Sequence, residues 1–268
     1  MENIKEMQSK LELITRRGWF FLLFILNLFV PPYVSKGSSL QEWGKITDEI
    51  LSQAIIYNLP FLVYLIFKII PIILICSIIL FKNKVARLFS VYVAITYVLF
   101  ALLQNIAISQ KHGLGIVTTN LIMFLAVALF WFWEAIVCEN DFAPQKQPLW
   151  KYWVVPFALL AFWYPTNPKT LMPDFNPLYL FTNDVGLAFC MMTPVYIAIL
   201  TLYYPRINIA TLRVTSLVGT IIAFSNMLSN FLIAPDQLWW NGVLHLPLLI
   251  ISIYGLILSL RKKPVERY

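Results

Sequence analysis

The stretch LWWNGVLHLPLLIISIYGLILSL, from Leu238 to Leu260, carries no charged side chain over its whole length. A helix that crosses a membrane needs about 20 consecutive, mostly apolar residues, so this stretch predicts a transmembrane helix. Its most polar side chains are Asn241 and His245, one helical turn apart. Because polar groups inside a bilayer are costly and usually have a partner or a purpose, these two residues mark the helix as a candidate for function.

The composition of the chain extends this prediction to the whole protein. Of its 268 residues, 60% are hydrophobic and only 12% are charged, whereas a soluble domain carries about 25% charged residues. We therefore predict an all-α, polytopic membrane bundle that forms a single domain over residues 1–268, with membrane lipids as its surroundings. The formal net charge is +7, but the basic residues flank apolar segments and no nucleic-acid-binding motif is present, so no nucleic-acid partner is expected.

Apolar runs predict about eight transmembrane helices, of which the fifth is short. Their expected ranges are Gly18–Val34, Ile55–Phe81, Val85–Ile108, Gly113–Cys138, Tyr152–Tyr164, Leu178–Tyr204, Ile209–Ala234 and Leu238–Leu260.

The orientation follows from the positions of Lys and Arg, which are enriched in cytoplasmic segments. With the N-terminus inside, the outer segments hold only Lys36, Lys45, Lys111 and Lys169, and all other basic residues except Lys68 fall in inner segments. This predicts cytoplasmic N- and C-termini and a multi-pass protein of the plasma membrane.

Three connecting segments have a character of their own. Residues 35–52 are expected to form a short interfacial helix, because Leu40, Trp43, Ile46 and Ile50 recur at helical spacing. The proline-rich segment 165–177 is expected to be an irregular loop. The inner loop 139–147 separates two sets of four helices, 1–138 and 151–268, which share a weak likeness of the kind seen in transporters with internal repeats.

Polar side chains from six predicted helices fall at similar depth. With a rise of 1.5 Å per residue, counting from the inner basic anchors puts them roughly 20–27 Å above the inner surface, in the outer half of the membrane. If their faces converge, they line a cavity that is open to the outside. The predicted ligand-binding residues are Lys68, Gln104, Asn105, Asn120, Asp184, Asn226, Asn230, Asn241 and His245.

Helical spacing supports a shared interior for three of these helices, the third, the seventh and the eighth. The third carries Ser90, Ala94, Tyr97, Ala101 and Gln104 or Asn105 on one face. Ser252 and Gly255 lie on the face of His245, and Ser216 and Gly219 lie on the face of Asn226, and small residues of this kind let helices approach closely. His245 is then turned inward. Two interpretations stay open for it: a hydrogen bond to a neighbouring helix, or a functional imidazole.

Lys68 and Asp184 form a second pair of interest, since either charge is expensive to bury alone. They are interpreted as a charged ligand site or a proton-coupled switch. The alternative is that Asp184 is wetted at the outer interface while the Lys68 side chain reaches toward water.

Aromatic residues near the ends of the predicted helices are interpreted as belts at the membrane–water interfaces. They include Trp163 and Tyr164 on the outer side and Trp131 and Trp133 on the inner side, where Glu134 is expected at the level of the lipid head groups.

The sequence identifies no cofactor and no metal site. Cys76, Cys138 and Cys190 show no paired spacing, and none of the common zinc, serine-nucleophile or phosphate-binding motifs is present. The first hypothesis is a transporter that binds a small organic molecule. The alternatives are a membrane-embedded enzyme acting on a lipid or isoprenoid, with His245 and Asp184 as catalytic candidates, and a non-catalytic subunit that binds a membrane partner chain.

Overall fold

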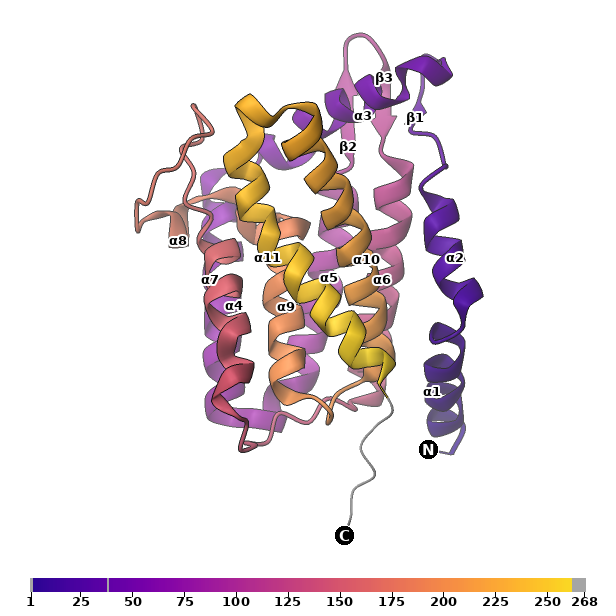
Figure 1. The fold of residues 1–268 in the computed structure, drawn as a ribbon, viewed down its shortest axis with the longest axis vertical. Helices are drawn as coiled ribbons and strands as arrows, with labels where there is room; N and C mark the ends of the chain where they lie inside the picture. Colours follow the sequence, from indigo (N-terminus) through magenta and orange to yellow (C-terminus); the bar gives the residue numbers. More distant parts are fainter. Residues whose placement is uncertain (1, 38, 262–268) are drawn as a thin grey trace.

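The computed structural model describes residues 2–37 and 39–261 and consists mainly of helices that run side by side (Figure 1). The α-helices are α1 (Glu2–Thr15), α2 (Gly18–Asn27), α3 (Trp43–Ser52), α4 (Phe61–Phe81), α5 (Ala86–Leu103), α6 (Thr118–Val137), α7 (Val154–Trp163), α8 (Tyr179–Thr182), α9 (Phe189–Tyr203), α10 (Ile209–Leu228) and α11 (Pro235–Leu260). The short helical turns are η1 (Leu40–Glu42), η2 (Ile55–Asn58), η3 (Lys82–Val85), η4 (Leu149–Trp153), η5 (Asp184–Leu187) and the π-helical η6 (Ser229–Ile233), and the strands are β1 (Tyr33–Val34), β2 (Ile106–Ser109) and β3 (Gly113–Ile116).

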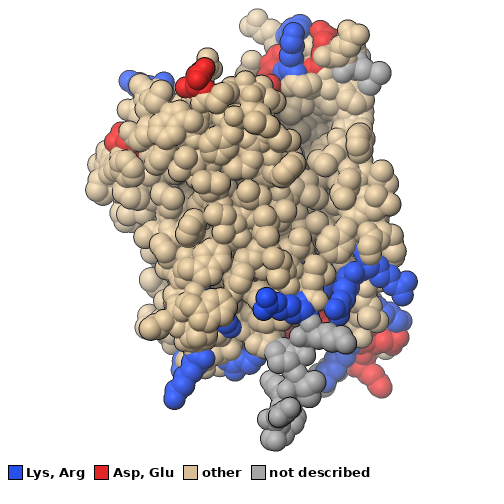
Figure 2. Space-filling view, in the orientation of Figure 1, with Lys and Arg blue, Asp and Glu red and all other residues tan. Residues whose placement is uncertain are grey.

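The two ends of the bundle differ in structure and charge. We call the end that carries α3 and the strands the cap end, and the opposite end, where α1 and the end of α11 lie, the basic end (Figure 1). Figure 2 shows Lys and Arg gathered at the basic end, a smaller group of both signs at the cap end, and a broad band without charged side chains between them. An uncharged band of this kind suits a surface that faces lipid tails.

Four of the described helical stretches are long and apolar enough to cross a membrane. They are Phe61–Leu103, which contains α4, η3 and α5, and the stretches Thr118–Val137, Ile209–Ile233 and Pro235–Leu260. The shorter apolar helices are Gly18–Asn27, Leu149–Trp163 and Phe189–Tyr203. The chain is therefore compatible with an integral membrane protein, and each predicted span contains a helix, although several helices are shorter than expected.

The predicted sixth span is broken where a continuous helix was expected. The segment forms α8, η5 and α9 in turn, and the Asn183 side chain accepts a hydrogen bond from the Val185 backbone at the start of η5. A Cβ on Gly186 would overlap the backbone oxygen of Phe67. Glycine thus allows η5 to lie directly against α4, and the helix breaks to make this contact.

A small antiparallel sheet replaces the predicted helical ends around residue 110. Strand β3 pairs with both β1 and β2, in the order β1-β3-β2. Helix α5 ends at Leu103 because Asn105 donates to the backbone oxygens of Phe100 and Ala101, and Gly113 supplies a φ of 70° at the turn. The fold is therefore helical with a small β-structured cap, not entirely α.

Helix α3 covers this sheet, which confirms the helix predicted in residues 35–52. Ile46 and Ile50 are buried in a small core with residues of the strands. A Cβ on Gly115 would lie 2.7 Å from Ile50 Cγ1, so the helix rests closely on the backbone of β3.

Helix α9 lies in the middle of the bundle, and nearly all of its residues are buried. Hydroxyl groups fasten it to α5: Thr96 and Tyr196 are 3.1 Å apart, and Tyr97 and Thr193 are 3.0 Å apart. The rings of Tyr97 and Tyr196 also touch each other, and such ring pairs contribute about 0.5–1.5 kcal/mol beyond area burial. These bonds orient the aromatic core and give the hydroxyl groups of Thr96, Tyr97, Thr193 and Tyr196 partners inside it.

Small residues bring α10 and α11 together, as the sequence pattern predicts. A Cβ on Gly219 would overlap Ser252, and one on Gly255 would overlap Ser216 and lie 2.8 Å from Ile197 Cγ2. The faces carrying these residues therefore meet in the interior, where van der Waals packing rather than the hydrophobic effect holds membrane helices together.

Arg213 joins three helices at the basic end, although only 2% of its surface is exposed. Its guanidinium donates to the backbone oxygen of Glu12 at 2.9 Å, to Thr15 Oγ1 at 2.6 Å and to the backbone oxygen of Ser259 at 2.6 Å. These acceptors lie in the last turns of α1 and α11, where the helix dipole favours a cation. Arg213 thus ties α1 to the bundle.

The loop between α6 and η4 is also fixed at the basic end. Asp141 accepts from Asn83 Nδ2 at 2.7 Å and pairs with Arg206 at 3.0 Å. Partial burial raises the pKa of Asp141, but hydrogen bonds from the Ala143 backbone and Asn83, together with the Arg206 charge, outweigh it, so the pKa lies below its usual value. The loop therefore links η3 to the turn between α9 and α10.

We expect Gly255→Ala to lower the free energy of unfolding by about 1–3 kcal/mol, because the added methyl overpacks the α10–α11 contact. The measurement is thermal unfolding in mild detergent. Gly44→Ala is the matched control, since no atom lies within 4 Å of a Cβ at that position. Equal melting temperatures for both variants would contradict close packing at Gly255.

Candidate functional site

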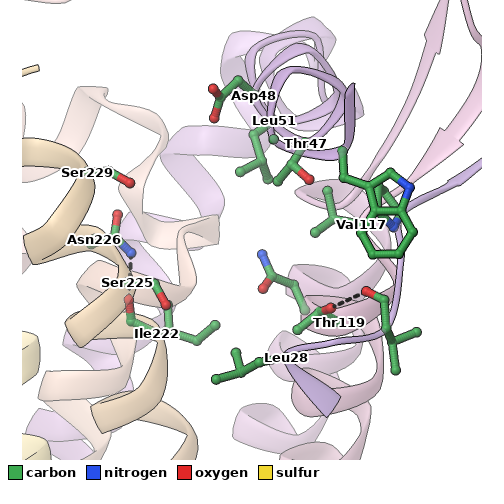
Figure 3. A pocket seen from close by; sticks show the side chains of 15 residues that line it. Leu28, Thr47, Asp48, Leu51, Val117, Thr119, Ile222, Ser225, Asn226 and Ser229 are labelled. Carbon is green, nitrogen blue, oxygen red and sulfur yellow. Dashed lines mark hydrogen bonds between the residues drawn. The ribbon is translucent and has the colours of Figure 1, made fainter. Parts of the chain in front are cut away.

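A cavity of about 320 Å³ lies near the cap end, between α2, α6 and α10 and beneath α3 (Figure 3). This volume is at the lower end of the range for small-molecule sites, about 300–1,000 Å³. The cavity is lined by Leu28, Val30, Pro32, Trp43, Gly44, Thr47, Asp48, Leu51, Val117, Thr119, Asn120, Ile222, Ser225, Asn226 and Ser229. We call it the cap-end cavity.

The segment that follows α2, with Leu28, Val30 and Pro32, forms one wall because the end of α2 is tied to α6. Asn27 Nδ2 donates to the Thr119 backbone oxygen at 2.9 Å, and Thr119 Oγ1 lies 3.2 Å and 3.1 Å from the backbone oxygens of Asn27 and Val30. These bonds satisfy carbonyl groups at the end of α2, which lack partners in the helix. They hold α2 beside α6 and leave room between α2 and α10.

Helix α3 forms the roof and is bound to the strands by polar contacts. Glu49 lies 3.3 Å from His112 Nε2, and Glu42 lies 4.0 Å from Lys111 Nζ. Hydrogen bonds from Ser39 lower the pKa of Glu42, and the charge of Lys111 adds to this effect.

The cavity contains two of the residues that the sequence predicts as ligand-binding, Asn120 and Asn226. Asn226 Nδ2 donates to its own helix at Ile222 O, 2.9 Å away. The Asn226 side-chain oxygen and the Asn120 side chain form no hydrogen bond with any other residue that the structure describes. Both amides can therefore bond to a ligand.

Hydroxyl groups and one carboxylate complete the polar lining. Ser225 and Ser229 come from α10 and its π-helical extension, and Thr47 and Asp48 come from the roof (Figure 3). Ser225, Ser229 and Asp48 are exposed. A π-helical turn disturbs the regular bonding of a helix and is frequent at functional sites. The arrangement offers many neutral hydrogen-bonding groups and one negative charge at the rim.

Gln104 and Asn105 have structural partners instead of facing this cavity. Gln104 Oε1 accepts from the Phe189 backbone at 2.9 Å, which caps the start of α9. Asn105 caps the end of α5 and is fully buried. Their amides pair with backbone groups at the helix ends, which have no partner within the helix.

Lys68 is fully buried in α4 and bonds to α7. Its ammonium donates to the backbone oxygen of Phe162 and lies 4.2 Å from the centre of the Phe162 ring. Asp184 starts η5, which lies against α4, but the two charged groups make no direct ion pair in the described part of the chain. The structure brings them into one region without forming a closed charged site.

Three further predicted residues, Asn230, Asn241 and His245, belong to a separate network of hydrogen bonds. Asn241 donates to Asn230 Oδ1 at 3.1 Å and accepts from the Tyr164 hydroxyl at 2.8 Å. His245 Nδ1 lies 2.7 Å from the Asn241 backbone oxygen. The sequence suggests that Tyr164 is an interfacial aromatic residue and does not reveal that it is a hydrogen-bond partner of Asn241.

The basic end holds a buried cluster that the sequence did not predict. Glu134 is only 1% exposed and faces the interior of the protein. It accepts from the Asn140 backbone at 2.8 Å and from Asn208 Nδ2 at 2.9 Å, and Gln8 of α1 donates to Asn208 Oδ1 at 3.1 Å. The only signal for it was a carboxylate inside an apolar run.

The interpretation of Trp131 as a residue of an aromatic belt at the membrane–water interface is wrong. Its side chain is fully buried, and its Nε1 donates to Thr215 Oγ1 at 3.1 Å. A tryptophan can occupy the interior when its N–H finds a partner, and Thr215 provides one.

Among residues 2–37 and 39–261, no group of three or more His, Cys, Asp and Glu side chains is close enough to hold a metal ion. Comparison of the chain with protein-family models, curated proteins and solved structures finds no match.

We expect Lys68→Met to lower the free energy of unfolding by about 1–3 kcal/mol, because the apolar chain fills the same space but leaves the Phe162 backbone oxygen without its donor. Lys68→Ala should cost about 2–4 kcal/mol, since it leaves a cavity. Thermal unfolding in detergent measures both, with the exposed Lys169→Met as the control. If Lys68→Met melted at the wild-type temperature, the ammonium bond to Phe162 would contribute nothing to the stability of the fold.

Proposed function

We propose that this protein is a multi-pass transporter of the plasma membrane that binds a small organic molecule in the cap-end cavity. Both termini lie in the cytoplasm and the cap end faces outward in this proposal. The excess of Lys and Arg at the basic end supports that orientation (Figure 2). The eight helical segments predicted from the sequence would then act as eight spans, with the shorter ones completed by their flanking turns.

One observation carries the proposal of binding. The Asn120 side-chain amide and the Asn226 side-chain oxygen have no hydrogen-bond partner among the described residues and line a cavity of about 320 Å³. Ligand sites typically combine apolar walls with a few placed polar groups, and Leu28, Val117 and Ile222 provide such walls here. The ligand class that fits is a neutral molecule with hydroxyl or amide groups.

The two alternatives gain no specific support. His245 does not line the cap-end cavity, and its contact is with its own helix. A catalytic role for His245 and Asp184, or a role as a subunit beside another membrane chain, therefore stays a hypothesis.

The orientation can be tested with single cysteines in a background where Cys76, Cys138 and Cys190 are replaced by alanine. Lys45→Cys should react with a membrane-impermeant maleimide added to intact cells. Lys146→Cys should react only after the cells are permeabilised. Both side chains are exposed, so a reversed pattern would invert the orientation, and equal labelling of both would refute the membrane topology.

Binding can be tested by native mass spectrometry of protein purified in mild detergent. We expect a small organic molecule on the wild type and at least tenfold less of it on Asn226→Leu. Asn58→Leu is the matched control, because Asn58 is exposed and outside the cavity. A bare wild-type protein would argue against stable binding, and a stoichiometric second chain would favour the subunit hypothesis.

A further inference from the structure

The entrance of the cap-end cavity lies on the side of the bundle. Ser225 and Ser229 line the cavity and are exposed. Their neighbours on α10, Phe224 and Leu228, are 60% and 41% exposed, and Leu28 on the facing wall is 43% exposed. A polar cavity thus opens through a rim of apolar side chains.

The spacing of the helices explains this opening. Arg213 ties the α1 end to α10 at the basic end, whereas Asn27 and Thr119 tie α2 to α6 at the cap end. Helix α2 therefore diverges from α10 toward the cap end. Figure 2 shows the surface hollowed on this side, below the charged residues of the cap.

The depth of the opening decides what can reach it. Counting from Arg213 at 1.5 Å per residue, Ser225 and Ser229 lie roughly 18 and 24 Å along α10. The hydrocarbon core of a bilayer is about 30 Å thick. In the orientation proposed above, the opening thus faces lipid tails, and a free polar solute could not cross them to enter.

The lining also limits the charge of the ligand's polar part. Asn120, Asn226 and Thr47 are neutral, and the single charged residue of the lining, Asp48, is negative and exposed. An anionic head group would find no cation in the cavity and would be repelled by Asp48. Neutral hydroxyl or amide groups would find donors and acceptors on several sides.

A second, mainly apolar cavity of about 500 Å³ adjoins the first and shares Val30, Pro32 and Trp43 with it. The remaining residues of this cavity include Pro31, Tyr33 and Val34. The combined space has a polar and an apolar part, as an amphiphile requires.

From these observations we infer that the ligand is an uncharged amphiphile that enters from the bilayer between α2 and α10 and places its hydroxyl- or amide-bearing head against Asn120 and Asn226. This inference rests on the proposed function and specifies its ligand. It also identifies the route of entry as lateral.

The test uses the full chain in phosphatidylcholine nanodiscs and three photoreactive probes with the same acyl chain: a monoacylglycerol, a lysophosphatidic acid and a fatty alcohol. Intact-mass and peptide analysis quantify and locate the cross-links. We expect the monoacylglycerol to label residues 222–229 or 27–32 at least fivefold more than the lysophosphatidic acid. Unlabelled monoacylglycerol should compete, and free glycerol should not.

Two variants distinguish a specific binding site from non-specific contact with lipid. Asn120→Leu/Asn226→Leu should lose at least fivefold of the monoacylglycerol labelling but retain the fatty-alcohol labelling, which also reports that the protein is folded. Asn58→Leu should label like the wild type. Equal labelling by all three probes, or no effect of the double variant, would overturn the inference.

A parallel measurement distinguishes this failure from failure of the proposed function. Asp48→Cys, which places the thiol on the exposed rim of the cavity, is treated in the cysteine-free background with a water-soluble maleimide, with and without glycerol or glucose. Protection by these free polyols, without specific amphiphile labelling, would retain a small-molecule site and overturn the lateral route. If the experiments showed no protection and no specific labelling, both proposals would be overturned.

Discussion

Every backbone N–H and C=O that a broken helix releases inside a membrane must find a partner within the protein. This constraint accounts for much of the polar chemistry in the bundle. Asn105 closes α5, Gln104 opens α9, and Lys68 bonds to the end of α7. The breaks that shape the protein exist because these side chains take over the released backbone groups.

The same constraint explains what the sequence could and could not predict. Apolar length locates the helices, and the spacing of Gly219 and Gly255 predicts the contact between α10 and α11. The composition does not reveal that residues 106–116 form a hairpin, because Ile106 and Ile108 suit a helix and a strand equally. Nor does it reveal the break before α9, which depends on the distant backbone of Phe67.

Polarity at a given depth was likewise an incomplete guide to the site. Depth along the helix groups Asn105 with Asn226, but only the position of neighbouring helices separates them. Asn105 is fully buried and bonds to its own helix end, whereas Asn226 borders the space that α2 leaves beside α10. That space depends on Asn27 and Thr119, two residues that draw no attention in the sequence.

The junction at Arg213 bears on how this chain can change over evolutionary time. Two of the guanidinium's three acceptors are main-chain carbonyls, at Glu12 and Ser259. A carbonyl is present whatever amino acid occupies the position, so substitutions at these two sites leave the acceptors in place. Loss of Arg213 itself, or of the Thr15 hydroxyl, instead removes hydrogen bonds that no main-chain group replaces.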